Sequence, residues 1–301
     1  ADLQSIPGEA LGDARFATAA DAIARKRQVY AGRVGYEVWH LEVDEERNWF
    51  QRAFRDGVLT RDLTPDEKKE TLRRLNQVDG LERFIGRVYQ GYKRFSVEGT
   101  DTLIPMLDEV IRESGRSGAR EIVIGMAHRG RLNVLTNVMG KPFESLFAEF
   151  EGRHDHADEN ATGDVKYHMG FVGTRDVDGT AVTLRLAPNP SHLEVVNPVI
   201  EGMVRALQRL PGTSAERNEL VVVPVAIHGD AAFPGEGIVA ETLNIANLNA
   251  YRTGGTIHII VNNQVGFTTD PTDARSTHYA SDLAKGFEMP IFHVNADDAQ
   301  G

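Results

Sequence analysis

Five short apolar runs, each followed by a turn and an amphipathic stretch, constrain the fold of this sequence most strongly. The runs are Glu121–Met126, Thr180–Leu186, Leu220–Ile227, Thr256–Val261 and Ile291–Val294. Runs rich in Val and Ile that alternate with helical stretches are typical of a parallel sheet covered by helices on both faces. The sequence therefore predicts an α/β fold: a three-layer sandwich around a mainly parallel sheet.

A helical segment precedes this region. Apolar residues recur every three or four positions around 15–30, 45–56, 65–78 and 101–115, which predicts amphipathic helices. Thr64-Pro65-Asp66-Glu67 has the capping pattern of a helix start, with Pro at the first helical position. We therefore expect residues 1–115 to form a helical segment that packs on a main α/β domain, residues 116–301.

Composition excludes several functional classes. The 301 residues carry a net charge of -11, which argues against nucleic acid or an anionic membrane as the main partner. There is no Cys, so disulfides, thiolate metal sites and a cysteine nucleophile are excluded. No apolar run approaches the roughly 20 residues of a membrane helix, and the first residues lack the pattern of a signal or transit peptide. An anionic ligand must therefore be held by a local group of charges.

Polar residues follow two of the predicted strands directly. His228-Gly229-Asp230-Ala231-Ala232 comes after Ile227, and Asn262-Asn263-Gln264-Val265-Gly266 comes after Val261. In an open parallel sheet the ligand binds beyond the carboxyl ends of the strands. A carboxylate at one end and an amide oxygen at the next, completed by a loop carbonyl and phosphate oxygens, would suit Mg²⁺.

Asp230 and Asn263 lie 33 positions apart, which leaves room for a crossover helix around 236–250 and a returning strand. Gly-Asp followed at this spacing by Asn-Asn is similar to the thiamine diphosphate motif of transketolase-like and 2-oxoacid-decarboxylating enzymes. Ala231 stands where that motif usually has Gly. Taken alone, the two pairs are explained equally well as turn-forming residues after strands.

Longer segments carry a more specific resemblance. They are GMAHRGRLNVL (125–135), GDVKYHMG (163–170), NPSHLEVV (189–196) and IVNNQVGFTTDPTDARST (260–277). With the Asp230 segment, and in this order, they resemble the thiamine-diphosphate-dependent dehydrogenase (decarboxylating) component of the 2-oxoglutarate dehydrogenase complex. The resemblance runs from about Gly35 to Asp298.

The resemblance implies a role for each matching residue. Asp230 and Asn263 would bind Mg²⁺ through their side chains and Val265 through its backbone carbonyl. The implied cofactor-binding residues are Arg129, Ser191, Leu193, Asp230, Ala231, Ala232, Asn263 and Val265. His128, Arg129, His168 and Ser191 would bind the 2-oxoacid, with His128 and His168 as catalytic residues. Cationic and proton-donating groups suit a dicarboxylate substrate and an anionic cofactor.

The resemblance also implies oxidative decarboxylation of 2-oxoglutarate, with transfer of the succinyl group to the lipoyl-bearing succinyltransferase component. A homodimer is implied, in the cytoplasm of a bacterium or the mitochondrial matrix of a eukaryote. The essential Glu of related enzymes lies in a pyrimidine-binding domain, which we do not find in this chain, so we expect an exposed apolar rim and little activity from it alone. The alternatives are a 2-oxoadipate dehydrogenase, a non-oxidative 2-oxoglutarate decarboxylase, and a non-catalytic scaffold that retains the fold.

Several residues have a structural alternative. Arg129 and Arg131 both follow a strand, so one of them would satisfy carbonyls or pair with an acid such as Asp164; Arg129 is the preferred ligand because it adjoins His128. A lone His such as His168 is often a core residue, although its place after a polar loop favours a functional role. No nucleophile elbow supports a Ser191–His192 hydrolase, and no dinucleotide fingerprint or Walker sequence is present. His154, His156, Asp158, Glu159 and His168 could be taken for a zinc site, but an exposed loop at 151–168 is the preferred interpretation.

Overall fold

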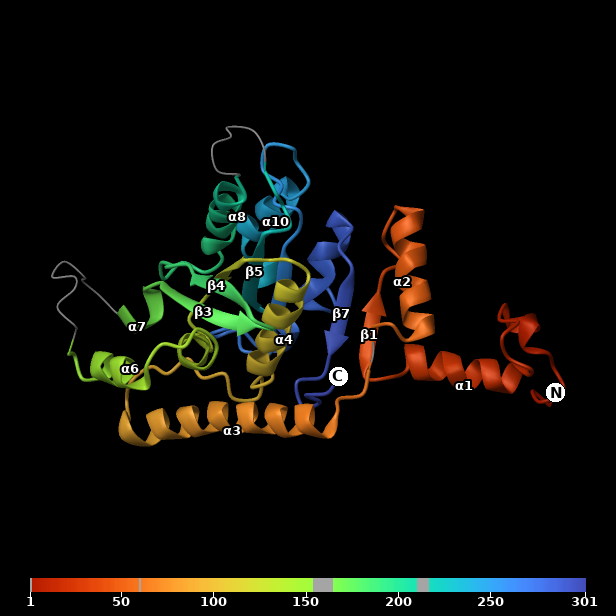
Figure 1. Ribbon diagram of the computed structural model, residues 1–301, viewed down its shortest axis with the longest axis horizontal. Coiled ribbons are helices and arrows are strands. Elements are labelled where there is room, and N and C mark those ends of the chain that lie inside the picture. The colour runs from red at the N-terminus through yellow and green to blue at the C-terminus, as the bar shows by residue number, and fades with distance from the viewer. Residues whose placement is uncertain (1, 60, 154–164, 210–216) are drawn as a thin grey trace. The chain divides into compact units, whose positions relative to one another are not determined.

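The chain is seen in a computed structural model that describes residues 2–59, 61–153, 165–209 and 217–301. It divides into two compact units (Figure 1). One comprises Ala1–Lys68 with Ala284–Gly301, and the other comprises Lys69–Leu283. The second unit contains every residue for which the sequence predicts a functional role.

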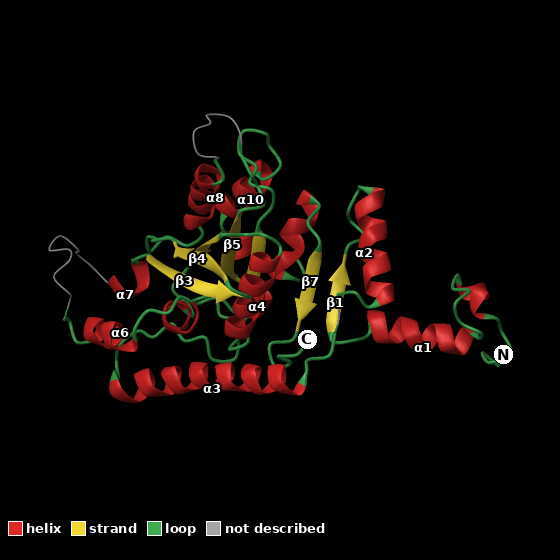
Figure 2. Cartoon of the chain, in the orientation of Figure 1, coloured by secondary structure: helices red, strands yellow, loops and turns green. Residues whose placement is uncertain are grey.

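A five-stranded sheet forms the centre of the second unit (Figure 2). Its strands are β2 (Glu121–Met126), β3 (Phe171–Val177), β4 (Thr180–Leu186), β5 (Val222–Gly229) and β6 (Ile257–Val261), in the order β3-β4-β2-β5-β6. All neighbours are parallel except β3 and β4, which form an antiparallel hairpin. The predicted mainly parallel sheet is confirmed, and four of its strands lie where the sequence places them.

Helices cover both faces of this sheet, as the two buried clusters show. On one face, Leu107 of α4 (Leu103–Arg116) packs with Ile124 and Leu184. On the other face, Ile200 of α8 (Val196–Leu207) packs with Val123 and Ala226, and α10 (Gly237–Ile245) lies beside α8. The remaining helices that lie wholly or partly in this unit are α3 (Pro65–Val88), α5 (Arg131–Asn133), the π-helical turn η2 (Val134–Val138), α6 (Phe143–Phe150), α7 (Val165–His168), α9 (Ala232–Gly235) and the 3₁₀ turns η3 (Pro271–Asp273) and η4 (Ala280–Phe287). The three-layer α/β sandwich is confirmed.

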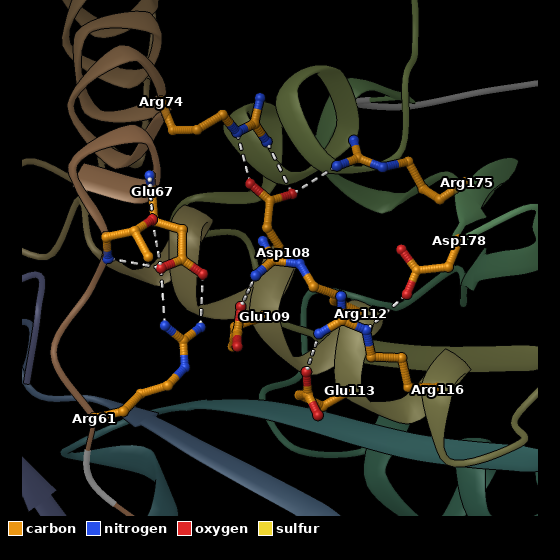
Figure 3. Close-up of polar contacts among 11 residues, drawn as sticks. Arg61, Glu67, Arg74, Asp108, Glu109, Arg112, Glu113, Arg116, Arg175 and Asp178 are labelled. Carbon is orange, nitrogen blue, oxygen red and sulfur yellow. Dashed lines mark hydrogen bonds and ion pairs between the residues drawn. The ribbon is translucent and has the colours of Figure 1, made fainter. Parts of the chain in front are cut away.

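The division into units falls elsewhere than the expected boundary between residues 115 and 116. The apolar face of α4 packs against β3 and β4, so this helix is part of the sandwich. A charged network also joins it to α3 and β3: Arg74 Nε donates to Asp108 Oδ2 at 2.6 Å, and Arg175 Nη2 donates to Asp108 Oδ1 at 2.8 Å (Figure 3). Much of the helical segment therefore belongs to the α/β unit.

The first unit contains the other elements. They are η1 (Gly8–Leu11), α1 (Ala19–Tyr30), β1 (Val34–Glu37), α2 (Asp44–Asp56) and β7 (Ile291–Val294). The prediction that 291–294 joins the parallel sheet is wrong, because β7 pairs antiparallel with β1. Its residues alternate between buried or half-buried and exposed, as suits a small two-stranded sheet with one covered face. Tyr36 of β1 stacks on Phe54 of α2, with ring centroids 3.9 Å apart.

Two local predictions have different outcomes. The capping pattern at Thr64 is confirmed: α3 begins at Pro65, and the Thr64 amide donates to Glu67 Oε2 at 2.8 Å while the Glu67 amide donates to Thr64 Oγ1 at 3.3 Å. The predicted exposed loop at 151–168 lies mostly outside the described residues, but its end forms α7, in which Tyr167 is buried. None of the described helices is long and apolar enough to cross a membrane.

Candidate functional site

The parallel strands bring the predicted site residues to one edge of the sheet. Because β4, β2, β5 and β6 run in the same direction, the segments that follow them meet at their shared carboxyl edge. Since β3 runs the opposite way, the segment that precedes it reaches the same edge. In strand order, the residues placed there are His168, then Ser191 and Leu193, then His128 and Arg129, then Asp230, Ala231 and Ala232, and finally Asn263 and Val265.

Three of these residues gather on the β3, β4 and β2 side of the edge. His168 Nε2 lies 3.4 Å from Ser191 Oγ, and the His168 carbonyl accepts from the Asn189 amide at 3.0 Å. Burial lowers the pKa of the half-buried His128, and the nearby charges of Arg129, His168 and Lys93 lower it further. His128 is therefore neutral at neutral pH and can donate one hydrogen bond to an anionic ligand.

The sequence did not identify Phe95, whose ring packs against that of His128. The rings of Phe95 and His128 lie with centroids 3.9 Å apart, and Tyr167 packs edge-on against Phe95 at 4.9 Å. Phe95 has φ of 47°, a left-handed conformation that is uncommon for a bulky residue, and its carbonyl accepts from the Gly130 amide at 2.9 Å. This contact comes from a loop distant in sequence from His128, and no sequence motif marks it.

Arg129 and Arg131 have different surroundings. Arg131 is fully buried and donates to the carbonyls of Met126 at 3.1 Å, Met169 at 2.8 Å and Ala187 at 2.9 Å. Burial lowers its pKa to about 10. Arg129 is half-buried and donates through Nη1 to the Ser96 carbonyl at 2.9 Å. Arg129 thus bonds one carbonyl, whereas fully buried Arg131 bonds three and is the arginine with the structural role. Asp164 lies outside the described residues.

Asp230 and Asn263 follow the neighbouring strands β5 and β6. Gly229 pairs with Val261 at the end of the ladder, so the two residues leave adjacent strand ends. The loops that they begin approach closely, because a Cβ added to Gly266 would lie 3.2 Å from the Cβ of Ala231. Asn263 Oδ1 accepts from the Val265 amide at 3.0 Å, which ties together two of the predicted metal ligands.

The chemistry of these residues fits Mg²⁺ and a diphosphate. The Asp230 side chain is buried, and its Oδ1 has no hydrogen-bond partner among the described residues. An unpaired buried carboxylate oxygen is costly, so it marks a position where a cation would be stabilised. Carboxylate, amide and backbone carbonyl oxygens are the ligands that Mg²⁺ takes, with phosphate oxygens completing the shell.

Comparison with known proteins decides the family. The sequence profile described as "Dehydrogenase E1 component" matches residues 73–300. The chain belongs to this family. It is similar to the 2-oxoglutarate dehydrogenase E1 components of Bacillus mycoides strain KBAB4 (48% identical over 311 residues) and Bacillus cereus strain AH187 (47% over 308 residues). Each comparison covers 100% of this chain but 32% of the relative, so the chain spans about a third of the length of these relatives.

The zinc site considered as an alternative for this E1 family member lies mostly outside the described residues. His154, His156, Asp158 and Glu159 lie outside the described residues. Within residues 2–59, 61–153, 165–209 and 217–301, no three His, Cys, Asp or Glu side chains are grouped to hold a metal ion. The predicted magnesium site is of another kind, since it uses a single carboxylate together with amide and carbonyl oxygens.

A buried chain of side chains that the sequence did not reveal lies beside Asp230. Glu194 Oε2 lies 2.6 Å from His228 Nδ1, and His228 Nε2 lies 2.9 Å from Nδ1 of His258 on β6. Asn197 Nδ2 donates to the same Glu194 oxygen at 2.8 Å. Glu194 is buried and has φ of 65°, so its backbone is held in a strained conformation while its carboxylate joins the segment after β4 to the end of β5.

This chain gives a pH-dependence that can be tested. Burial, followed by the charge of His228, lowers the pKa of His258 to about 3 from the ordinary 6.5. Between about pH 3 and pH 6.5, His258 therefore holds fewer protons in the folded protein than in the unfolded one. The stability that neutral His258 contributes is fully present above pH 6.5 and is lost as pH falls toward 3.

We expect the free energy of unfolding of the full-length protein to fall less steeply between pH 7 and 5 in His258→Asn than in the wild type. The difference should approach about 1.4 kcal/mol per pH unit for one proton. Urea unfolding at several pH values measures it, and His192→Asn, at an exposed His near Glu194, is the matched control. Equal slopes in His258→Asn and wild type would contradict the assignment.

Proposed function

We propose that this chain provides the Mg²⁺-diphosphate site and part of the substrate site of a 2-oxoglutarate dehydrogenase E1 component. The observation that carries the proposal is the carboxyl edge of the sheet, where buried Asp230, with one oxygen unpaired, and Asn263 leave adjacent parallel strands. The family match and the printed names of the Bacillus relatives support the same reaction. The reaction is the oxidative decarboxylation of 2-oxoglutarate with transfer of the succinyl group to a lipoyl carrier.

Each group of residues at the edge has a part in this reaction. When bound, thiamine diphosphate supplies the electron sink that accepts the electrons left as CO₂ departs. Asp230, Asn263 and the Val265 carbonyl would hold Mg²⁺, so we expect the side-chain oxygens of Asp230 and Asn263 to lie within about 5 Å of each other. Ala231 and Ala232 would leave room for the diphosphate, and Arg129, Ser191 and Leu193 would contact the cofactor.

His128 and His168 bind the carboxylate of the substrate that is distant from the reacting carbon. His128 is held by Phe95 and is neutral at neutral pH, so it presents an N–H to this carboxylate. His168, 3.4 Å from Ser191, provides the second polar contact and Arg129 the positive charge. Hydrogen bonds to a charged group are stronger than those between neutral groups. Selection of a dicarboxylate thus rests on residues from three segments.

The proposal extends to partners that lie beyond this chain. The acceptor is the lipoyl-bearing succinyltransferase component, and a homodimer supplies the catalytic Glu from a pyrimidine-binding domain. We place the protein in the bacterial cytoplasm by its likeness to Bacillus relatives. Phe267 and Val265, on the loop after β6, have exposed apolar side chains. Exposed apolar side chains at a site indicate an interaction surface, so these two support the proposal that another part of the enzyme covers this edge of the sheet.

Substrate selection gives the direct test. In the full-length protein, His128→Ala should lower kcat/KM for 2-oxoglutarate by roughly 10- to 100-fold, the value of a hydrogen bond to a charged group. A shorter monocarboxylic 2-oxoacid should lose much less, because it has no distal carboxylate. Steady-state kinetics with both substrates measure the difference, and His192→Ala, at an exposed position, is the control. Equal losses for both substrates would show that His128 serves the cofactor or the fold.

Two further measurements separate the alternatives. Comparing 2-oxoglutarate with 2-oxoadipate, with and without a lipoyl acceptor, distinguishes the three decarboxylating activities. Calorimetry with thiamine diphosphate and Mg²⁺ distinguishes an enzyme from a scaffold, since a scaffold has no need of a metal-binding Asp230. An absence of binding by the full-length protein would overturn the proposed function.

A further inference from the structure

Asp230 is paired with Arg275, and the pair is incomplete. Arg275 Nη1 lies 3.6 Å from Asp230 Oδ2, with the two side chains only 13% and 3% exposed. This distance is too long for a hydrogen bond. Arg275 comes from the segment after η3, beyond Asn263, and reaches back to the residue that follows β5. The pair therefore links the two loops that form the proposed metal site.

Three buried polar atoms of this pair lack partners. Asp230 Oδ1 and the Nε and Nη1 atoms of Arg275 make no hydrogen bond to any described residue. A buried ion pair compensates for lost hydration only when hydrogen bonds satisfy its remaining donors and acceptors. The buried Arg74 shows the ordinary solution, with Nε bonded to Asp108 at 2.6 Å and Nη1 to Gln77 at 3.0 Å. The Nε and Nη1 donors of Arg275 instead remain available to bind a ligand.

We propose that Arg275 binds an anionic oxygen of the diphosphate whose Mg²⁺ is bound by Asp230. This inference rests on the proposed function and adds a cofactor-binding residue to it. In a magnesium diphosphate, the Mg²⁺ ion would bind the Asp230 carboxylate. The anionic phosphate oxygens would accept hydrogen bonds from the Arg275 guanidinium, so one ligand would satisfy both residues of the pair. Arginine suits this role because its planar group of donors matches phosphate oxygens.

The net charge of the chain favours a local cationic residue at a diphosphate site. With a net charge of -11, the chain does not attract a diphosphate by its overall field. Of the arginines at the carboxyl edge described above, Arg131 is committed to three backbone carbonyls and Arg129 donates to the Ser96 carbonyl. Arg275 is the arginine placed against Asp230 itself, which puts its charge at the metal end of the site.

The proposal predicts different effects of one substitution on the binding of two ligands. A guanidinium close to the Asp230 carboxylate repels a bare Mg²⁺ ion but attracts the oxygens of a diphosphate. Arg275→Gln should therefore leave the binding of Mg²⁺ alone unchanged or tighter. The same variant should bind thiamine diphosphate, in the presence of Mg²⁺, roughly 10- to 100-fold more weakly, and Arg275→Lys should recover part of the loss. An arginine that only stabilises the loops would weaken both ligands together.

Isothermal titration calorimetry of the full-length protein measures both dissociation constants, first with Mg²⁺ alone and then with thiamine diphosphate at saturating Mg²⁺. Arg74→Gln is the matched control, because it removes another buried, ion-paired arginine of the same unit. The folded fraction of Arg74→Gln should bind thiamine diphosphate with the dissociation constant of the wild type. Unchanged binding of thiamine diphosphate to Arg275→Gln, or equal weakening of both ligands, would overturn the role of Arg275. If the wild type itself does not bind, the proposed function fails first.

Discussion

Replacing Asp230 by Asn in the full-length protein is expected to weaken binding of Mg²⁺ with thiamine diphosphate by on the order of 100- to 1,000-fold, since the charge of the ligands sets metal affinity over such ranges. The substitution keeps the shape of the side chain and removes its charge. Among the predicted metal ligands, Asp230 alone carries a charge, so neither Asn263 nor Val265 can replace it. Decarboxylation of 2-oxoglutarate should be lost in the same proportion at limiting cofactor.

Calorimetry and activity assays at increasing Mg²⁺ concentration measure this effect. Asp273→Asn is the matched control, because Asp273 is an exposed carboxylate on the loop that also carries Arg275. It should retain wild-type binding. An Asp230→Asn variant that bound the cofactor as tightly as the wild type would show that the metal lies elsewhere, and the proposed site would then be wrong.

The sequence predicted the central strands because their burial leaves a simple pattern. β2, with five of its six residues buried, requires the continuous apolar run seen at Glu121–Met126. The strand β3 was missed, because this edge strand alternates half-buried and exposed residues and carries Gly173, Arg175 and Asp176. Such composition is typical of a surface loop as well as of an edge strand. The run at 291–294 was recognised as a strand, but its partner in β1 lies far away in sequence.

The candidate site could likewise be predicted only where a local sequence pattern or the sheet topology determines it. Residues that directly follow parallel strands could be assigned to one edge because topology alone brings strand ends together. Contacts between side chains of separate segments leave no pattern in the sequence, so they could not be predicted from it. His228 was noted only as a neighbour of Asp230, although it bonds Glu194, 34 positions earlier, and His258, 30 positions later. Arg275 lay within a segment that carried the family resemblance, but nothing in its immediate neighbours indicates that it reaches Asp230.

Arg131 holds together the strand ends on which the histidine side of the site is built. Its guanidinium bonds the carbonyl of Met126, at the end of β2, of Ala187, just after β4, and of Met169, just before β3. His128, His168 and Ser191 all lie within four residues of one of these carbonyls. A single buried side chain therefore sets the spacing of the segments that carry the proposed substrate contacts.

Replacing Arg131 by Met, which is apolar and similar in length, leaves these buried carbonyls without their donor. We expect the full-length protein to lose about 3 to 5 kcal/mol of unfolding free energy, because unpaired buried polar groups cost about 1 to 3 kcal/mol each and neighbouring losses are not fully additive. Urea unfolding followed by circular dichroism measures the loss. Arg185→Met is the control, since Arg185 forms a partly exposed ion pair with Glu121 and should cost no more than about 1 kcal/mol. If the two variants were equally stable, the three carbonyls would have found other donors, and Arg131 would not be what fixes the positions of His128 and His168.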